Sequence, residues 1–164
     1  MFFHNFVSNL EIMNKTGKVV SVNISEKKGV IKLPVEKITL CDTGIEKDAH
    51  AGDWHRQVSL LAAESITKFE EVLGRKITFG EFAENITTEG LILHEMKPGD
   101  ILKLGEKVKL EVTQIGKKCH GEGCAIYTAV GKCVMPKEGI FCRVIDNGKV
   151  EANTAIIYIP ANES

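Results

Sequence analysis

The feature of this sequence that most restricts its fold is a succession of short apolar runs separated by Gly, Pro, Asn and Asp residues. Runs of β-branched and apolar residues bounded by turn formers are typical of strands. The expected strands lie within residues 17–25, 30–40, 101–116 and 154–160, with a hairpin turn inside the third range. Pro34 interrupts the second range and cannot donate to a ladder, so we expect it at a sheet edge or a bulge.

One segment has a helical period instead. The apolar residues between Leu60 and Val72 recur at the spacing of a helix face rather than at every second position. Ser59 can cap the start of such a helix, and Gly74 can end it. Residues 59–74 are therefore expected to form the main helix of the protein.

The element count indicates the fold class. One substantial helix and about seven to nine short strands predict a mostly β protein, a barrel or a sandwich with short helical additions. An Asn-Gly pair within residues 141–150 predicts a further tight hairpin. The 164 residues match the size of one domain, and no repeat or linker divides them. We expect a single domain over residues 1–164.

The charge balance and the cysteine count argue against several classes of protein. With 21 basic and 22 acidic side chains, the chain lacks the overall positive field of nucleic-acid-binding proteins. The N-terminal segment is not a convincing signal peptide, and no run of about 18 apolar residues occurs. We therefore expect a cytoplasmic protein that binds neither nucleic acid nor a membrane. Its five cysteines, an odd number, are expected to be thiols.

The segment richest in reactive groups is residues 117–144, where cysteines, a histidine and basic residues alternate with glycines. Two lysines at its start favour the thiolate form of a nearby cysteine. We expect Cys124 or Cys119 to be the reactive thiol, acting as a nucleophile or as a metal ligand. Cys133 and Cys142 are more simply explained as small apolar side chains packed in the interior.

A zinc site is the alternative for the same segment. Its ligands would be Cys119, His120, Cys124 and Cys133, a set of the type that tetrahedral zinc uses. The adjacent pair Cys119 and His120 is awkward for chelation by both residues, and no CxxC pair is present. The spacing argues against structural zinc and against a thioredoxin-like redox centre.

Two further segments carry polar residues that suit ligand binding. The candidates ahead of the expected helix are Lys47, Asp48, His50, His55 and Arg56. The planar fork of Arg56 suits phosphate or carboxylate, whereas either histidine could instead cap a turn. The loop within residues 79–91 adds Glu84, Asn85 and Thr87, which could serve only to satisfy backbone groups of a turn.

Four segments, taken together and in order, resemble the MOSC domain, the C-terminal module of molybdenum cofactor sulfurases. They are KDAHAGDWHRQVSLLAAES (47–65), FGEFAENITTEGL (79–91), PGDILKLGEKVKLEVTQIGKKCHGEGCAI (98–126) and EGIFCRVIDNGKV (138–150). The similarity runs over about residues 17–160. It implies a small stand-alone bacterial member of the family with a β-rich, barrel-like fold, in agreement with the strand count.

The resemblance also implies a site. In the family, a cysteine that follows the strand of the third segment carries sulfur or contacts the molybdenum of a pterin cofactor. The matching residue here is Cys124, with Cys119 as the rival. The residues that we expect to bind the molybdenum cofactor, molybdopterin, are Lys47, Asp48, His50, Arg56, Glu84, Asn85, Lys118, His120 and Arg143.

The function that this resemblance implies is molybdopterin binding or sulfur transfer, in sulfuration or delivery of the cofactor. One alternative is a non-catalytic delivery module, and another is a component of a molybdenum-dependent reductase acting on N-hydroxylated compounds. The pyridoxal phosphate associated with the family belongs to the desulfurase part of long sulfurases, for which 164 residues leave no room. Sulfur would therefore come from an external cysteine desulfurase, and a molybdoenzyme would receive the product.

Overall fold

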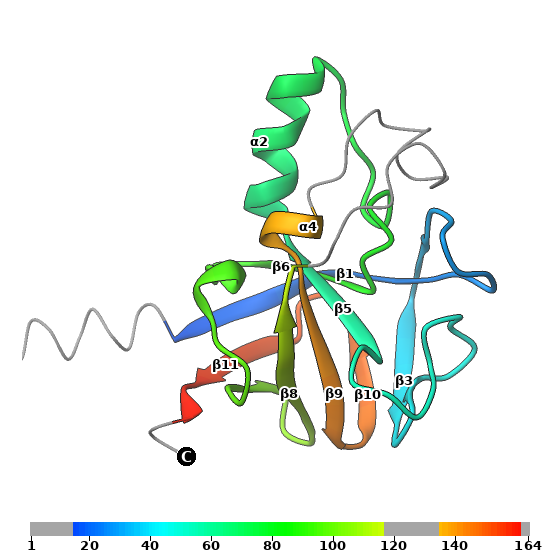
Figure 1. Ribbon diagram of the computed structural model, residues 1–164, viewed down its shortest axis with the longest axis vertical. Coiled ribbons are helices and arrows are strands. Elements are labelled where there is room, and N and C mark those ends of the chain that lie inside the picture. The colour runs from blue at the N-terminus through cyan, green and yellow to red at the C-terminus, as the bar shows by residue number, and fades with distance from the viewer. Residues whose placement is uncertain (1–14, 117–134, 162–164) are drawn as a thin grey trace, which may run out of the picture.

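The computed structural model of the chain describes residues 15–116 and 135–161. Figure 1 shows a β-barrel with one helix standing at its end. The strands are β1 (Thr16–Ile24), β2 (Leu33–Val35), β3 (Lys37–Cys41), β4 (Gly44–Ile45), β5 (Val58–Ala62), β6 (Ile86–Glu89), β7 (Ile101–Leu104), β8 (Val108–Ile115), β9 (Ile140–Asp146), β10 (Gly148–Glu151) and β11 (Ala155–Ile159). The helical elements are α2 (Ala63–Leu73), the 3-10 turn η1 (Leu93–Glu95) and α4 (Met135–Glu138). No helix in these two ranges is long and apolar enough to cross a bilayer.

Seven strands close into a barrel in the order β11, β7, β8, β9, β5, β6, β1. The ring closes because β1 pairs with β6 on one side and with β11 on the other. The neighbours are antiparallel except for β5 and β6, which run parallel. Strand β2 adds to β1, and β10, β3 and β4 form a separate small sheet. The prediction of a mostly β barrel with one main helix is confirmed.

Two apolar clusters fill the molecule. The barrel interior holds side chains that alternate with outward-facing ones along each strand, among them Leu60, Ile86, Leu102, Leu110 and Ile156. A smaller cluster lies under α2 and consists of Leu61, Ile66, Ile77, Phe82, Ala83 and Phe141. The second cluster fixes α2 and the segment before β6 against the outside of β5.

The main helix is shorter than the sequence predicts. It begins at Ala63, and Ser59 lies within β5, so the expected Ser59 cap is wrong. Strand β5 lies between β6 and β9, and all five of its residues are buried. A strand covered on both faces is apolar throughout, and its sequence cannot be told from a buried helix by period alone. Gly74 ends the helix as predicted, with φ 71° and its N–H donated to the carbonyl of Glu70.

The structure confirms the predicted edge position of Pro34 and contradicts the predicted hairpin at Asn147-Gly148. Pro34 lies in β2, which pairs only with β1, and this confirms its edge position. The Asn147-Gly148 pair does connect β9 to β10, but β10 pairs with β3, so the predicted hairpin is wrong. The reason is that β9 already pairs with β5 and β8 along its two sides.

Candidate functional site

The loop between β4 and β5, residues 46–57, holds most of the suggested binding residues, and a buried carboxylate anchors it. Lys32 donates its Nζ to Oδ1 of Asp48 at 2.7 Å, and both side chains are 0% exposed. The N–H of Ser25 donates to the same oxygen, and the N–H of His50 donates to Oδ2, each at 3.0 Å. Burial opposes ionisation, but Lys32 and the two N–H donors outweigh it, so the pKa of Asp48 lies below its usual value.

His50 connects this carboxylate to an aromatic ring. Its Nδ1 lies 3.8 Å from Oδ2 of Asp48, and its carbonyl accepts the Nε1–H of Trp54 at 2.8 Å. Two cations then lie against the Trp54 ring. Cζ of Arg56 is 4.8 Å from the ring centroid, and Nζ of Lys28 is 5.0 Å from it. Such contacts hold a cation by the negative face of the indole ring.

Arg56 is the residue of this loop best placed to receive an anion. Its Cζ also lies 5.7 Å from the ring centroid of Phe141, so two aromatic side chains fix the guanidinium. Its Nε is buried and finds no hydrogen-bond acceptor among residues 15–116 and 135–161. Buried donors without a partner are rare and costly, and the guanidinium fork matches phosphate or carboxylate.

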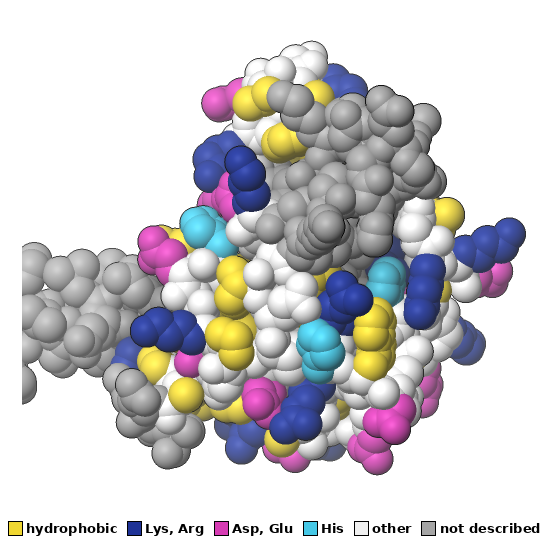
Figure 2. Space-filling view, viewed as in Figure 1, with side chains coloured by type: hydrophobic (Ala, Val, Ile, Leu, Met, Phe, Trp, Pro, Cys, Tyr) yellow, Lys and Arg dark blue, Asp and Glu magenta, His cyan; other side chains and the backbone are white. Residues whose placement is uncertain are grey.

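Two other predicted residues of the loop, Lys47 and His55, are exposed. Lys47 has a left-handed backbone, with φ 68°, and precedes the buried Asp48. The His55 ring contacts the Trp54 ring edge-on, with 6.4 Å between the centroids. Figure 2 shows histidine and basic side chains lying close to one another on the face of the molecule that carries β3, β5 and β9. The face also carries acid groups, because Asp42 and Asp53 line the same cavity as His55 and Arg143.

Glu84 lies before β6 and is fully buried. Its carboxylate accepts hydrogen bonds from the N–H of Gly80, the N–H of Phe82 and the hydroxyl of Thr87, at 2.9 to 3.2 Å. Burial raises the pKa of Glu84, and the three donors oppose that effect. The carboxylate therefore joins the turn before β6 to the strand itself.

Asn85 is buried next to it and joins three strands. Its Oδ1 accepts the N–H and the hydroxyl of Ser59 in β5, at 3.0 and 3.2 Å. Its Nδ2 donates to the carbonyl of Asn23 in β1 at 3.1 Å. Both predicted residues of this segment thus have protein partners, and a contact with the cofactor stays a prediction for each.

Arg143 lies on β9, on the outside of the barrel. Its Nε and Nη2 donate to Oε1 of Glu111 on the neighbouring strand β8, at 3.0 and 2.7 Å. It borders an open cavity of about 500 Å³, which is lined by Asp42, Asp53, Trp54, His55, Gln57, Arg143, Val144 and Ile145. The cavity brings Arg143 into the neighbourhood of the β4–β5 loop, and its contact with a cofactor stays a prediction.

Two of the five cysteines, Cys41 and Cys142, lie within the described residues. Cys142 is fully buried in the barrel core, which agrees with its interpretation as a packing residue. Burial raises the pKa of its thiol, and the nearby Glu111 adds to the shift. Cys41 is half-buried. The remaining predicted residues, Lys118, Cys119, His120, Cys124 and Cys133, lie outside the described residues.

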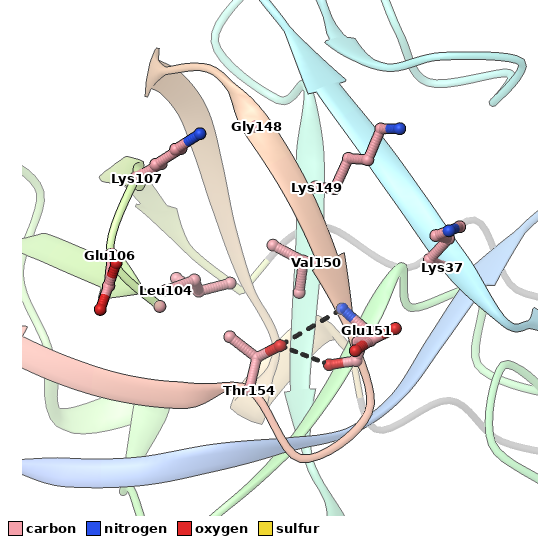
Figure 3. A pocket seen from close by; sticks show the side chains of 10 residues that line it. Lys37, Leu104, Glu106, Lys107, Gly148, Lys149, Val150, Glu151 and Thr154 are labelled. Carbon is pink, nitrogen blue, oxygen red and sulfur yellow. Dashed lines mark hydrogen bonds between the residues drawn. The ribbon is translucent and has the colours of Figure 1, made fainter.

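Another cavity lies elsewhere in the described ranges. It has a volume of about 630 Å³ and lies where the turn between β7 and β8 approaches β10 (Figure 3). Figure 3 shows Lys107 and Glu106 of that turn on one side of the opening and Lys149 and Glu151 of β10 on the other. Acidic and basic side chains are mixed around this opening, and it shares no residue with the β4–β5 loop.

Sequence reasoning missed three residues of this site. Lys32 and Lys28 come from the loop between β1 and β2, and Trp54 is the single tryptophan of the chain. A signal for Trp54 was present, because one large aromatic residue stands in a polar loop beside Arg56. Nothing in the sequence pairs Lys32 with Asp48, which lies 16 positions away.

Comparisons with known proteins agree with this architecture. The family model for the MOSC domain matches residues 47–157. The YuaD protein from Bacillus subtilis has a similar structure, with TM-score 0.72 and 18% identity over 88% of this chain and 96% of that one. YiiM from Geobacillus stearothermophilus gives TM-score 0.68 and 23% identity, over 87% of this chain and 75% of that one. YiiM from Escherichia coli gives TM-score 0.65 and 20% identity, over 90% of this chain and 74% of that one. No curated protein matches the chain significantly.

Proposed function

The chain belongs to the MOSC domain family, and on that premise we propose that it binds the molybdenum cofactor and carries sulfur destined for it. Cys124 is the proposed sulfur carrier or molybdenum ligand, with Cys119 as the alternative. The cofactor, when bound, supplies a metal centre that accepts sulfur ligands. The proposed compartment is the cytoplasm, where thiols stay reduced.

The binding part of the proposal rests on the surroundings of the Arg56 guanidinium. Its Nε is buried without an acceptor in the described ranges, while the rings of Trp54 and Phe141 lie close to the guanidinium carbon. An anionic group such as the phosphate of a pterin cofactor would satisfy this donor. Lys28, on the same indole ring, adds a second positive charge. The donor set therefore fits an organic phosphate.

The sulfur part of the proposal rests on the sequence of residues 117–126. The thiolate of Cys124 attacks the terminal sulfur of a donor persulfide, so a new S–S bond forms on Cys124. The S–S bond of the donor breaks, and the donor leaves as a thiolate, with no net oxidation or reduction. Lys117 and Lys118 favour the attacking thiolate electrostatically. A cysteine desulfurase is the proposed donor, and a molybdoenzyme is the proposed recipient.

Intact-mass spectrometry tests the sulfur carrier. The protein is incubated with a cysteine desulfurase and free cysteine, then alkylated and mapped by peptide. We expect a gain of about one sulfur atom, 32 Da, which Cys124→Ser removes and the matched control Cys41→Ser keeps. A persulfide that Cys119→Ser removes instead would move the role to Cys119. No sulfur adduct on either residue would overturn the sulfur-carrier function.

Cofactor retention tests the binding part separately. Protein produced in cells that make molybdopterin is purified, and bound molybdenum and pterin are measured. Arg56→Gln is expected to lower retention at least about tenfold, because the guanidinium no longer holds the anion. Arg75→Gln, which removes an arginine paired with Glu81 on the surface, is the control and should retain the cofactor. Equal retention by Arg56→Gln and the wild type would refute this site.

The buried Nε of Arg56, which has no acceptor in the described ranges, also supports a second candidate function, a non-catalytic delivery module. In that case the protein binds the cofactor through Arg56 and needs no reactive thiol. Cofactor retention that is lost in Arg56→Gln but unchanged in both Cys124→Ser and Cys119→Ser would favour delivery over sulfur transfer.

A further inference from the structure

We propose that Lys32 is a positioning residue for the anion site, which it holds in place through Asp48, His50 and Trp54. The inference rests on the proposed function insofar as Arg56 is taken to bind an anion. Lys32 lies 15 positions before the segment that matches the family model, residues 47–157, so the match assigns it no role. The proposal is carried by an uninterrupted series of contacts from the Lys32 backbone to the Arg56 guanidinium.

The backbone of Lys32 is the fixed end of this series. Its N–H donates to the carbonyl of Gly80 at 2.9 Å, and Gly80 has φ +93°. A Cβ on Gly80 would lie 2.2 Å from the Lys32 carbonyl oxygen, so the two backbones are in direct contact. Gly80 is in turn held by its N–H bond to the buried Glu84. Lys32 is therefore tied to the same rigid turn that precedes β6.

The side chain of Lys32 points inward from this anchor. Its Nζ donates to Asp48 Oδ1 at 2.7 Å and to the Ser25 hydroxyl at 3.0 Å, and the side chain is 0% exposed. A group so deeply buried cannot itself meet a ligand that arrives from solvent. Its charge acts instead on Asp48, which would otherwise be a buried carboxylate without a counter-ion.

Asp48 extends this series of contacts into the β4–β5 loop. Its Oδ2 accepts the N–H of His50 at 3.0 Å, and the His50 carbonyl accepts the indole N–H of Trp54 at 2.8 Å. The Trp54 ring then lies 4.8 Å from Cζ of Arg56. Each contact restrains the next, in the way that outer contacts orient the residues that touch a ligand. Loss of the Lys32 charge should therefore disturb Arg56 although the two side chains do not touch.

The test uses Trp54, the only tryptophan, as a reporter inside the site. Inorganic phosphate is titrated at constant pH and ionic strength while the indole fluorescence is followed. The wild type should show a saturable change that Arg56→Gln abolishes. Lys32→Met should weaken the apparent affinity at least about tenfold. Asp48→Asn and the double variant Lys32→Met/Asp48→Asn should weaken it by a similar factor, because both residues act through one path.

Two controls separate positioning from a general loss of stability or charge. Leu104→Ala opens a cavity in the barrel core, away from the loop, and should lower stability while phosphate affinity stays unchanged. Lys18→Met removes a surface lysine paired with Glu89 and should change neither stability nor phosphate affinity. Wild-type affinity in Lys32→Met, or an equal loss of affinity in Leu104→Ala, would overturn the positioning role.

A measurement without ligand tests the positioning role of Lys32 separately from the anion site at Arg56. Acrylamide quenching of Trp54 reports its exposure directly, and Lys32→Met should raise the quenching constant about twofold or more as the loop loosens. Unchanged quenching would overturn the role of Lys32 even if the wild type binds no phosphate. Wild-type protein without saturable phosphate binding, but with increased quenching in Lys32→Met, would overturn the anion site and leave the series of contacts supported.

Discussion

Replacement of Asn85 by Ala separates a structural role from a binding role for one of the expected cofactor residues. The side chain is 0% exposed and joins β6 to β5 and β1. The substitution removes the acceptor of the Ser59 N–H and the donor to the Asn23 carbonyl. The Ser59 hydroxyl is less affected, because it keeps its bond to the carbonyl of Ala83 at 3.1 Å. Two buried backbone groups therefore lose a partner.

The expected cost follows from those two groups. A buried polar group left without a partner costs about 1–3 kcal/mol, so the loss of two partners in Asn85→Ala should lower the free energy of unfolding by roughly 2–6 kcal/mol. For a chain of this size the Tm should fall by roughly 4–24 °C. Urea unfolding followed by Trp54 fluorescence measures the loss. Thr67→Ala is the control, because its exposed hydroxyl donates only to a carbonyl of its own helix, and it should change stability by less than about 0.5 kcal/mol.

The reasoning would be refuted by a loss below about 1 kcal/mol with an unchanged m-value. A lower cofactor retention in Asn85→Ala at wild-type stability would show instead that the amide contacts the ligand. That second outcome would support the role expected from the resemblance.

Three further predictions follow from the buried groups. Gly80→Ala should lower stability by about 2 kcal/mol or more, because its Cβ meets Lys32, whereas Gly29→Ala, with no atom within 4 Å, should cost less. The lowered pKa of Asp48 adds stability to the wild type above about pH 4 that is lost as the pH falls through the folded-state pKa, so the stability deficit of Lys32→Met should be largest near neutral pH and shrink in acid. Urea unfolding at several pH values measures this deficit, and a deficit that grows in acid would contradict the prediction. Burial that raises the pKa of Cys142 should protect it from iodoacetamide until urea unfolds the chain, and alkylation of Cys142 in native protein would contradict this.

Most of the barrel could be predicted from the sequence. Residues 17–25 and 101–116 alternate clearly, and they form β1 and the β7–β8 hairpin. The start of α2 could not be predicted, because β5 is apolar on both faces and runs directly into the helix. The hairpin expected at Asn147 failed for a different reason, since local turn chemistry does not reveal that both sides of β9 are already paired.

The candidate site was predicted only as a set of residue types. Arg56 was predicted to suit phosphate or carboxylate from its chemistry, and the structure adds two neighbouring rings and a buried Nε that has no acceptor among the described residues. Glu84 and Asn85 were recognised as polar residues of one loop, and the structure shows which backbone groups they satisfy. The reactive cysteine stays a prediction, because Cys119 and Cys124 lie outside the described residues.

Most of the strands, most of the turns that separate them and the end of the main helix at Gly74 could be predicted from the sequence, because these features depend on interactions between near neighbours in the chain. Long-range contacts in the folded protein set how the barrel closes, which strand pairs with β10 and which charge compensates Asp48. Those outcomes depend on groups far apart in the sequence, such as Lys32 and the β4–β5 loop. They meet because burial makes an unpaired charge or an open strand edge costly.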